Sequence, residues 1–233
     1  MTQLHKQVFV AATGTDIGKT YVTGALIRHL RATGIAACAL KPVISGFEDD
    51  NIAESDTGQL LAAMDRPPTP DEAAKISPWR LRAALSPDMA AARENRHIEI
   101  QEVTNFCRQD ANRSDADITF IEGVGGIMVP LNASATTLDW QVALNIPCLL
   151  VIGSYLGTMS HCLTALDTLS AKGIMPLAVI LNESPQSPVP LAETAASLIP
   201  FVNDIPIVPL PRNGAFSEQD RVYDLLTDTR LKS

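Results

Sequence analysis

The first residues with a chemical signature are Gly18, Lys19 and Thr20, at the end of residues 13–20. This segment follows an apolar run and precedes a helical pattern, so it joins a strand to a helix. At such a junction the backbone N–H groups and the positive end of the helix attract an anion. Gly18 lets the backbone approach a phosphate, Lys19 reaches the β- and γ-phosphates, and the Thr20 hydroxyl binds Mg²⁺. The strict spacing needs glycine where Thr13 stands, so the sequence predicts a variant P-loop.

Two carboxylates and a second lysine are expected near this loop. Glu122 ends an apolar run and precedes the glycine-rich residues 123–126, Asp56 follows a loop, and Lys41 directly follows another apolar run. If these runs are parallel strands, all three residues lie at the sheet edge where open α/β folds bind ligands. Carboxylates there hold the metal of a nucleotide, and two lysines favour an anionic substrate. The residues alone leave other interpretations open: Asp56 as a helix N-terminal acid, Glu122 as a solvated strand end, and Lys41 as a surface lysine.

Short apolar runs alternate with helical stretches along the chain. The expected strands are residues 8–12, 35–40, 118–121, 148–152, 177–181 and 205–208, and the expected helices are 19–32, 55–64, 99–111, 138–144, 158–172 and 191–198. Strands that are apolar on both faces and separated by helices indicate parallel βαβ units, with helices on both faces of the sheet. The proline-containing residues 65–87 and 183–190 are expected to be loops, which are often functional when long. The sequence predicts one α/β domain over residues 1–233, with a P-loop NTPase-like, mostly parallel sheet.

The composition excludes several classes of partner. The 233 residues carry 18 basic and 26 acidic side chains, a net charge of −8. This balance argues against nucleic acid or an anionic membrane as the main partner, because both need a basic face. No apolar run reaches the roughly 18 residues of a membrane span, and the first residues do not resemble a targeting segment. The four cysteines have no metal-binding spacing, and we expect buried, reduced thiols in a cytoplasmic protein.

These residues together resemble the dethiobiotin synthetase family, whose members are ATP-dependent carboxylases of biotin synthesis. The likeness covers most of the chain in the same order. The family loop G-T-D-T-x-x-G-K-T is matched at residues 12–20, K-P-V-x-S-G at 41–46, and E-G-x-G-G-x-x-x-P-L at 122–131. The remaining matches are an S-D pair at 55–56, a D-W pair at 139–140, L-G-x-x-x-H at 156–161, Asn182, and Pro-Leu-Pro at 209–211.

The resemblance implies a reaction. Its substrates are ATP, CO₂ or bicarbonate, and 7,8-diaminononanoate, and its cofactor is Mg²⁺. One amine takes up CO₂ as a carbamate, ATP phosphorylates the carbamate to a carbamic–phosphoric anhydride, and the second amine closes the ring and releases phosphate. The resemblance also implies a homodimer, in which backbone amides at the helix start near residue 158 seat the substrate carboxylate across the interface. We therefore expect a ligase with neither nucleic acid nor a membrane as partner.

The resemblance also assigns roles to individual residues. Catalysis falls to Lys41 and Lys19, which offset developing charge, together with Thr15 and Asp16. The expected substrate-binding residues are Ser45, Thr15, Thr158, Met159 and Ser160. The expected nucleotide-binding residues are Asp16, Ile17, Gly18, Lys19, Thr20, Tyr21, Asp56, Glu122, Gly123, Val124, Gly125, Asn182, Glu183, Pro209, Leu210 and Pro211. The expected Mg²⁺ ligands are Thr20, Asp56 and Glu122.

The chain departs from the family pattern at several positions. Ala12 stands where the family has its first loop glycine, and Gly14 stands where the family has aspartate. Because alanine tolerates a positive φ poorly, we expect Gly14 to provide the turn of the loop. Tyr155 and Ser160 replace a lysine and an asparagine near the later helix start.

Two other functions remain open on the sequence. A dimerising switch ATPase of the partition or septum-positioning kind shares a deviant P-loop, but its loop carries an additional lysine that residues 13–17 lack. An ATP-dependent amidase-type synthetase acting on corrinoid carboxylates usually carries a fused glutaminase domain, for which 233 residues leave no room. ATP hydrolysis that needs no diamine and is stimulated by another protein would indicate the switch ATPase.

Overall fold

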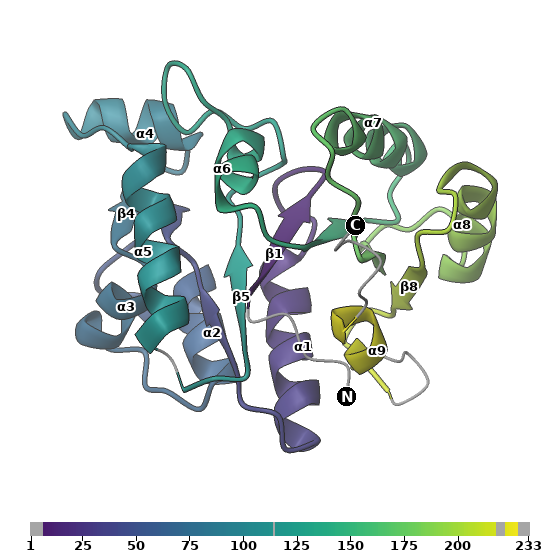
Figure 1. The fold of residues 1–233 in the computed structure, drawn as a ribbon, viewed down its shortest axis with the longest axis horizontal. Coiled ribbons are helices and arrows are strands. Elements are labelled where there is room, and N and C mark those ends of the chain that lie inside the picture. The colour runs from purple at the N-terminus through teal and green to yellow at the C-terminus, as the bar shows by residue number, and fades with distance from the viewer. Residues whose placement is uncertain (1–6, 114, 218–221, 228–233) are drawn as a thin grey trace.

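The computed structural model describes residues 7–113, 115–217 and 222–227, and a six-stranded parallel sheet forms its centre (Figure 1). The strands of this sheet are β1 (Gln7–Ala12), β2 (Ala37–Leu40), β5 (Ile118–Glu122), β6 (Cys148–Ile152), β7 (Ala178–Asn182) and β8 (Ile207–Leu210). Their order is β2-β5-β1-β6-β7-β8, and every neighbouring pair is parallel. Strands β1, β5, β6 and β7 are buried along their whole length, which explains their continuous apolar sequences.

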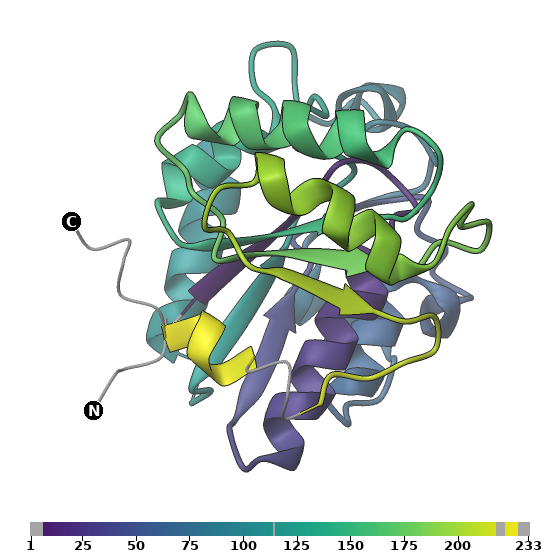
Figure 2. The same ribbon diagram turned by 90° about the vertical axis from the view of Figure 1, so that its right-hand side faces the viewer.

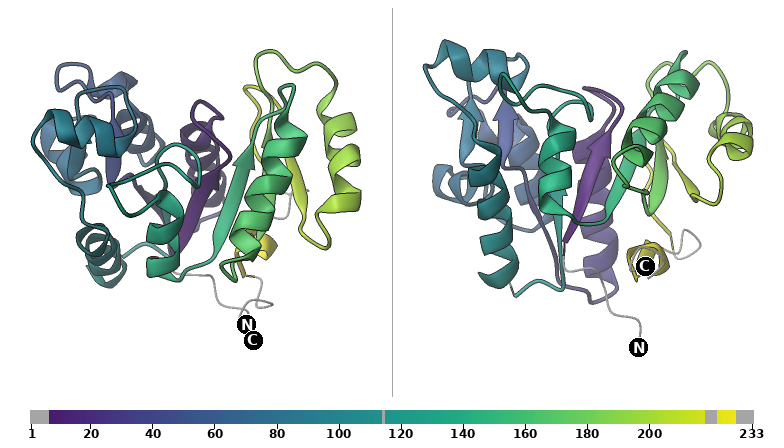
Figure 3. Two further views of the ribbon diagram at one scale, coloured as in Figure 1. Left: turned by 90° about the horizontal axis from the view of Figure 1, so that it is seen from above. Right: turned by 45° about the horizontal axis from the view of Figure 1, so that its top comes forward.

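Helices cover both faces of this sheet (Figures 2 and 3). The helices that cover the sheet or its edge are α1 (Lys19–Ala32), α2 (Asp56–Ala63), α5 (Ile100–Arg113), α6 (Thr137–Leu144), α7 (Thr158–Ser170) and α8 (Leu191–Leu198), and α9 (Val222–Thr227) follows near the end of the described chain. Helices α1 and α2 pack together on one face, whereas α5, α6 and α7 lie over the other, and α8 packs against the edge strand β8. Within the described residues, no helix is both long and apolar enough to cross a membrane.

A smaller parallel pair of strands lies beside the main sheet. Strands β3 (Val43–Ser45) and β4 (Trp79–Leu81) form it, and we call this pair the β3–β4 ribbon. The elements around the ribbon are the 3₁₀ turn η1 (Ile52–Glu54) and the helices α3 (Pro70–Ile76) and α4 (Pro87–Arg93), and a second 3₁₀ turn, η2 (Ile199–Phe201), follows α8.

The expectation that residues 65–87 form a loop is therefore wrong. Two of the prolines that suggested it are the first residues of helices: Pro70 begins α3 and Pro87 begins α4. Proline is well tolerated there, because the first N–H groups of a helix have no partner within the helix. The hydroxyl of Thr69 caps α3 by accepting a hydrogen bond from the N–H of Glu72.

The other expected elements are confirmed. All six expected strands occur, and the ends of the expected strands and helices lie within two residues of the observed ones. Residues 183–190 contain no helix or strand, as predicted. None of the four cysteines, all of which lie in the described part of the chain, forms a disulfide, and Cys107, Cys148 and Cys162 are buried. Cys38 is partly exposed, so the expectation of a buried thiol is wrong there.

The register of the sheet brings the candidate site together. Leu40 pairs with Ile121 and Val10 pairs with Glu122, so the segments that follow β2, β1 and β5 leave the sheet side by side. Lys41, which directly follows β2, therefore lies next to Glu122 at the end of β5. This carboxyl edge is where ligands bind in open parallel sheets.

Candidate active site

Two residues in the left-handed region shape the loop between β1 and α1. Asp16 has a φ of 56°, and Gly18, which caps α1, has a φ of 91°. A Cβ atom at Gly18 would also lie 2.3 Å from Nδ2 of Asn182, so this position needs glycine for both conformation and space. The expectation that Gly14 provides the turn is wrong, because its φ is not positive. Ala12 causes no strain, since it is the buried last residue of β1.

Two side chains hold this loop in place. Nδ2 of Asn182, at the end of β7, donates a hydrogen bond of 2.9 Å to the carbonyl oxygen of Ile17. Nζ of Lys19 donates a hydrogen bond of 3.1 Å to the carbonyl oxygen of Gly14. The first N–H groups of α1 have no acceptor within the helix and carry its positive dipole end. The loop is thus preformed for an anion.

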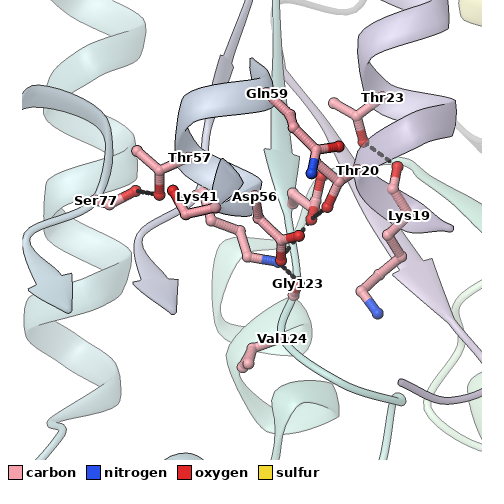
Figure 4. Close-up of polar contacts among 12 residues, drawn as sticks. Lys19, Thr20, Thr23, Lys41, Asp56, Thr57, Gln59, Ser77, Gly123 and Val124 are labelled. Carbon is pink, nitrogen blue, oxygen red and sulfur yellow. Dashed lines mark hydrogen bonds and ion pairs between the residues drawn. The ribbon is translucent and has the colours of Figure 1, made fainter. Parts of the chain in front are cut away.

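A buried cluster of charged and polar side chains lies beside the loop (Figure 4). Nζ of Lys41 lies 2.6 Å from Oε1 of Glu122 and 3.1 Å from Oδ2 of Asp56, and it also donates to the carbonyl oxygen of Gly123 at 3.1 Å. The hydroxyl of Thr20 donates to Oε1 of Glu122 at 2.7 Å. We call Lys41, Asp56, Glu122 and Thr20 the Lys41 cluster.

Burial settles the interpretations that the sequence left open. The side chains of Lys41 and Glu122 are only 2% and 0% exposed, so neither is a surface charge. Asp56 is the first residue of α2 and therefore is a helix N-terminal acid, but it also pairs with Lys41. One carboxylate serves both purposes, because the start of α2 faces the end of β2.

The charges in the cluster shift one another's pKa values. Burial alone would lower the pKa of Lys41, but the carboxylates of Glu122 and Asp56 outweigh burial and raise it above the usual value. Burial would raise the pKa of Asp56, but the charge of Lys41 lowers it below the usual value. Burial, followed by the charge of Lys41, lowers the pKa of Lys19 to about 8. Lys41 is therefore firmly charged, whereas Lys19 is the lysine of the site that loses its proton more easily as pH rises.

A cavity of about 850 Å³ opens beside the loop and the Lys41 cluster. The hydroxyl of Ser45, on the cavity wall, is buried and has no hydrogen-bond partner among the described residues, so it is free to bind a ligand. The predicted site residues that line the cavity are Thr15, Asp16, Gly18, Lys19, Thr20, Tyr21, Lys41, Ser45, Asp56, Val124 and Gly125.

The three expected Mg²⁺ ligands suit a hard cation. All of them offer oxygen, and Oε2 of Glu122 is buried without a hydrogen-bond partner among the described residues. Among the described residues, no group of three or more His, Cys, Asp and Glu side chains is placed to hold a metal ion. A cation here would therefore draw further oxygen ligands from a nucleotide or from water, as Mg²⁺ does.

Comparison with known proteins decides the family. A family model described as an AAA domain matches residues 6–213. The ATP-dependent dethiobiotin synthetase BioD of Methylobacterium nodulans is 46% identical over 213 residues, which cover 90% of this chain and 94% of that protein. Proteins of the same name from Acidiphilium cryptum and Caulobacter vibrioides are 46% and 43% identical, covering 85% and 95% of this chain and 89% and 99% of theirs. The chain belongs to the dethiobiotin synthetase family.

Solved structures with the same fold come from several groups of proteins. A ParA family ATPase from Chlorobium tepidum superposes with a TM-score of 0.51 at 14% identity, covering 95% of this chain and 91% of that one. The MinC:MinD cell division protein complex of Aquifex aeolicus gives a TM-score of 0.52 at 12% identity, covering 88% and 81%. At such identities the likeness shows the P-loop NTPase-like fold alone. The dethiobiotin synthetase relatives favour the ligase over the switch ATPase and the amidase-type synthetase.

Several residues that the family pattern assigns to the nucleotide lie beside the cavity rather than on its wall. The N–H of Glu183 donates to the carbonyl oxygen of Leu210 at 3.0 Å, and Oε2 of Glu183 accepts a hydrogen bond of 2.8 Å from the N–H of Arg212. The ends of β7 and β8 therefore form one surface next to Asn182 and the loop. The predicted residues that do not line the cavity are Ile17, Glu122, Gly123, Thr158, Met159, Ser160, Asn182, Glu183, Pro209, Leu210 and Pro211.

The start of α7 does not reach the cavity of its own chain. Gly157 caps this helix with a φ of 102°, and the buried hydroxyl of Thr158 donates to the carbonyl oxygen of Gly153 at 2.6 Å. Tyr155, where the dethiobiotin synthetase pattern has lysine, places its hydroxyl 2.7 Å from Nδ1 of His161. The substrate contacts expected of this segment are thus not made within one chain's cavity.

Sequence reasoning missed one wall of the cavity. Residues 84–87, which lead into α4 and include its first residue, line it together with Glu54 and Gln59. They arrive there because the β3–β4 ribbon is extended by a hydrogen bond of 3.1 Å from the N–H of Gly46 to the carbonyl oxygen of Ala83. The only signal in the sequence was the proline-containing segment, whose length suggested function but not position.

Proposed function

We propose that this chain makes dethiobiotin from 7,8-diaminononanoate, CO₂ and ATP, with Mg²⁺ as cofactor. One amine adds to CO₂ and loses a proton, which gives a carbamate. A carbamate oxygen attacks the γ-phosphorus of ATP, ADP leaves, and a carbamic–phosphoric anhydride forms. The second amine then attacks the carbonyl carbon, the bond from this carbon to the phosphate oxygen breaks, and phosphate leaves as the cyclic urea forms and a proton is released.

The observation that carries this proposal is that one cavity joins an anion-binding loop, two lysines and an unpartnered hydroxyl. The loop around Gly18 offers N–H groups to the polyphosphate, and Lys19, the next residue, lines the same cavity. Ser45, whose buried hydroxyl has no partner among the described residues, is the group that we assign to the carbamate or an amine. Thr15 and Asp16, on the cavity wall, are assigned to the boundary between phosphate and diamine.

Lys41 is assigned to the phosphoryl group as it moves from ATP to the carbamate. An ammonium has three N–H donors, and those of Lys41 face Glu122, Asp56 and the carbonyl oxygen of Gly123. A contact with the phosphoryl group therefore replaces one of these bonds. Asp56 is the partner to exchange, because it is 44% exposed and its contact is longer than that of the buried Glu122.

Thr20, Asp56 and Glu122 are the residues that would hold Mg²⁺. The ion neutralises the polyphosphate when it is bound. The buried and unpartnered Oε2 of Glu122 supports this assignment, because an orphaned carboxylate oxygen is costly unless a cation or a donor satisfies it.

The nucleoside is assigned to the surface at the ends of β7 and β8. The residues that form this surface are Asn182, Glu183, Pro209, Leu210 and Pro211. Backbone N–H and carbonyl groups in such a position can form hydrogen bonds with the edge of the uncharged nucleotide base. The link from Asn182 to the carbonyl oxygen of Ile17 supports the assignment, because it ties this surface to the phosphate-binding loop.

A homodimer completes the proposed site. Thr158, Met159 and Ser160 lie at the start of α7, outside their own chain's cavity, so we assign their amides to the substrate carboxylate of a second copy. Leu156, next to them, is 89% exposed, which suits a contact with another chain. A cytoplasmic location is part of the same proposal, because the reaction consumes ATP.

The deciding experiment measures phosphate release from ATP with ¹³C-bicarbonate present, with and without 7,8-diaminononanoate. We expect release only with the diamine, and one ¹³C in each product molecule by mass spectrometry. Lys41→Met should abolish both signals, whereas Lys172→Met, at an exposed lysine after α7, should leave them unchanged. Phosphate release that needs no diamine would contradict the proposal and favour a switch ATPase.

A further inference from the structure

A second polar cavity, of about 530 Å³, lies outside the candidate active site. Its volume falls in the range that small-molecule sites occupy. Three arginines gather in it, although the chain as a whole carries a net charge of −8. The residues that line this cavity, which we call the arginine pocket, are Phe47, Asp49, Pro78, Arg80, Arg82, Glu94 and Arg96.

Two of the arginines are held in place by neutral groups. Nη1 of Arg80 donates to the carbonyl oxygen of Ser77 at 2.7 Å, and its guanidinium carbon lies 5.5 Å from the centre of the buried Phe47 ring. Nη1 of Arg96 donates to the carbonyl oxygen of Arg80, also at 2.7 Å. A guanidinium has five N–H donors, so these bonds fix the side chains and leave most of their donors for a ligand.

The positive charge of the pocket is only partly neutralised. Oε1 of Glu94 accepts from the backbone N–H of Arg82 at 2.7 Å, and Oε2 of Glu94 lies 3.4 Å from Nη1 of Arg96. Among the described residues, the guanidinium of Arg82 makes no hydrogen bond, and neither Arg80 nor Arg82 forms an ion pair. Asp49, which is exposed, is the remaining acid of the pocket.

The contacts of other arginines in the described part of the chain are of two kinds. Arg31 pairs with Asp65 at 2.8 Å, and Arg66 pairs with Glu72, so both use a carboxylate as their partner. Arg108 instead donates to the carbonyl oxygen of Ala143 at 2.7 Å, as Arg80 does to that of Ser77. What distinguishes the arginine pocket is that two arginines without a carboxylate partner line one cavity. Two guanidinium groups without a carboxylate partner, Arg80 and Arg82, match the charge and the fork-shaped hydrogen bonding of a phosphate dianion.

The pocket and the candidate active site share the β3–β4 ribbon. Gly46 lines the active-site cavity and its neighbour Phe47 lines the arginine pocket. In the same way Arg82 faces the pocket, while residues 84–87 line the active-site cavity. The two cavities are thus separate, with no lining residue in common.

We propose that the arginine pocket is a second binding site, for a small molecule that carries a phosphate group. Arg82 supplies a free guanidinium, Arg80 supplies a pre-oriented one over the Phe47 ring, and Arg96 closes the rim. This assignment is independent of the reaction at the Lys41 cluster, because it uses none of the residues there.

Equilibrium dialysis with ³²P-labelled inorganic phosphate tests the proposal, with the active site saturated by Mg²⁺ and a non-hydrolysable ATP analogue. We expect one phosphate per chain under these conditions. Arg82→Gln should weaken its binding at least fivefold, and Arg80→Gln should do the same. Arg93→Gln makes the same charge change at an exposed position of α4 outside the pocket, and should leave the affinity unchanged.

The possible results test the binding site and the chemical class of its ligand separately. Phosphate binding that is absent, or equally strong in Arg82→Gln, would overturn the site. Displacement by succinate at concentrations equal to or below those of phosphate would overturn the phosphate class in favour of a dicarboxylate. Because the Arg82 guanidinium holds no other described group, Arg82→Gln should fold normally, and its thermal unfolding midpoint checks this.

Discussion

The replacement Lys41→Met tests the charge balance of the site most directly. Methionine keeps much of the length and apolar volume of lysine but removes its charge. The side chain of Lys41 is 2% exposed and faces Glu122, which is fully buried, as well as the half-exposed Asp56. Without the ammonium, the charge of Glu122 would be left in the protein interior with the Thr20 hydroxyl as a hydrogen-bond partner and with the charge of Lys19 farther away.

The geometry sets the size of the effect. At 2.6 Å and an effective dielectric constant near 20, the attraction between Lys41 and Glu122 is about 6 kcal/mol, most of it offset by the cost of burying both charges. Removing one partner leaves that cost uncompensated, so we expect Lys41→Met to lower the free energy of unfolding by about 3–5 kcal/mol. Adding Glu122→Gln should restore most of this loss, because the stranded charge is then gone.

Urea denaturation, followed by circular dichroism, measures both variants. The exposed pair of Arg31 and Asp65, at 2.8 Å, provides the matched control: Arg31→Met should cost about 0–1 kcal/mol. If Lys41→Met costs no more than Arg31→Met, the cluster does not depend on its buried charge pair. A double variant less stable than Lys41→Met alone would equally refute the reasoning.

Three further predictions follow from the loop and the cavity. The affinity for Mg·ATP should fall as pH rises above about 8, the pKa of Lys19 without a bound ligand, because a neutral Lys19 no longer attracts phosphate. Calorimetric titrations at several pH values should show this decline in the natural chain and none in Lys19→Met. Gly18→Ala should abolish binding of a fluorescent ATP analogue, because alanine at a φ of 91° costs about 1–2 kcal/mol and its Cβ atom would lie 2.3 Å from Nδ2 of Asn182. Retained affinity would show that the loop can relax. Ser45→Ala should raise the KM for the diamine at least tenfold. It should leave the free energy of unfolding unchanged, because the hydroxyl has no partner among the described residues. An unaltered KM would remove Ser45 from the substrate site.

The parts of the fold that were predictable are those whose signal is local. Strand β6 (Cys148–Ile152) and helix α8 (Leu191–Leu198) were predicted to the residue. In β6 every side chain is buried, so the apolar run itself marks both ends, and Pro147 stops the run on one side. Helix α8 begins directly after Pro190. A helix that started earlier would hold this proline in its interior, where proline breaks the hydrogen-bond pattern. Neither assignment needs knowledge of a distant partner.

The β3–β4 ribbon was not predictable in this way. Each of its strands has three residues, and they are joined in space by the pairing of Val43 with Trp79, far apart in the chain. Three residues are too few to show a period of two, and Arg80 interrupts the apolar pattern of the second strand. The active-site wall at residues 84–87 and the arginine pocket both depend on this pairing, so they could be found only from the structure.

The charged residues of the site were predictable as types, but their partners were not. That Lys41, Asp56 and Glu122 meet at one edge follows from their places after parallel strands. Lys41 contacts both carboxylates among the three expected Mg²⁺ ligands; its contact with Glu122 follows from the strand order, which sets β2 directly beside β5. The loop turn was misplaced at Gly14 for a similar reason, because one of the two causes of the need for glycine at position 18, the close approach of Asn182, comes from a different strand.

The charge balance of the site bears on how Asp56 and Glu122 could bind both Lys41 and a metal ion. The Lys41 cluster alone carries a net charge of −1, and the charge of Lys19 beside it brings the sum to zero, so these side chains can be buried without stranding a charge. A triphosphate adds several negative charges, and in the described part of the chain Lys19 has no ion pair to give up. Under the proposed function, the remaining negative charge would be matched by a cation that arrives with the nucleotide, or by Lys41 if it leaves Asp56. Under the proposed function, a cation that took the carboxylate oxygens would free Lys41 to contact the phosphoryl group, so the proposed metal site and the proposed role of this lysine would depend on each other.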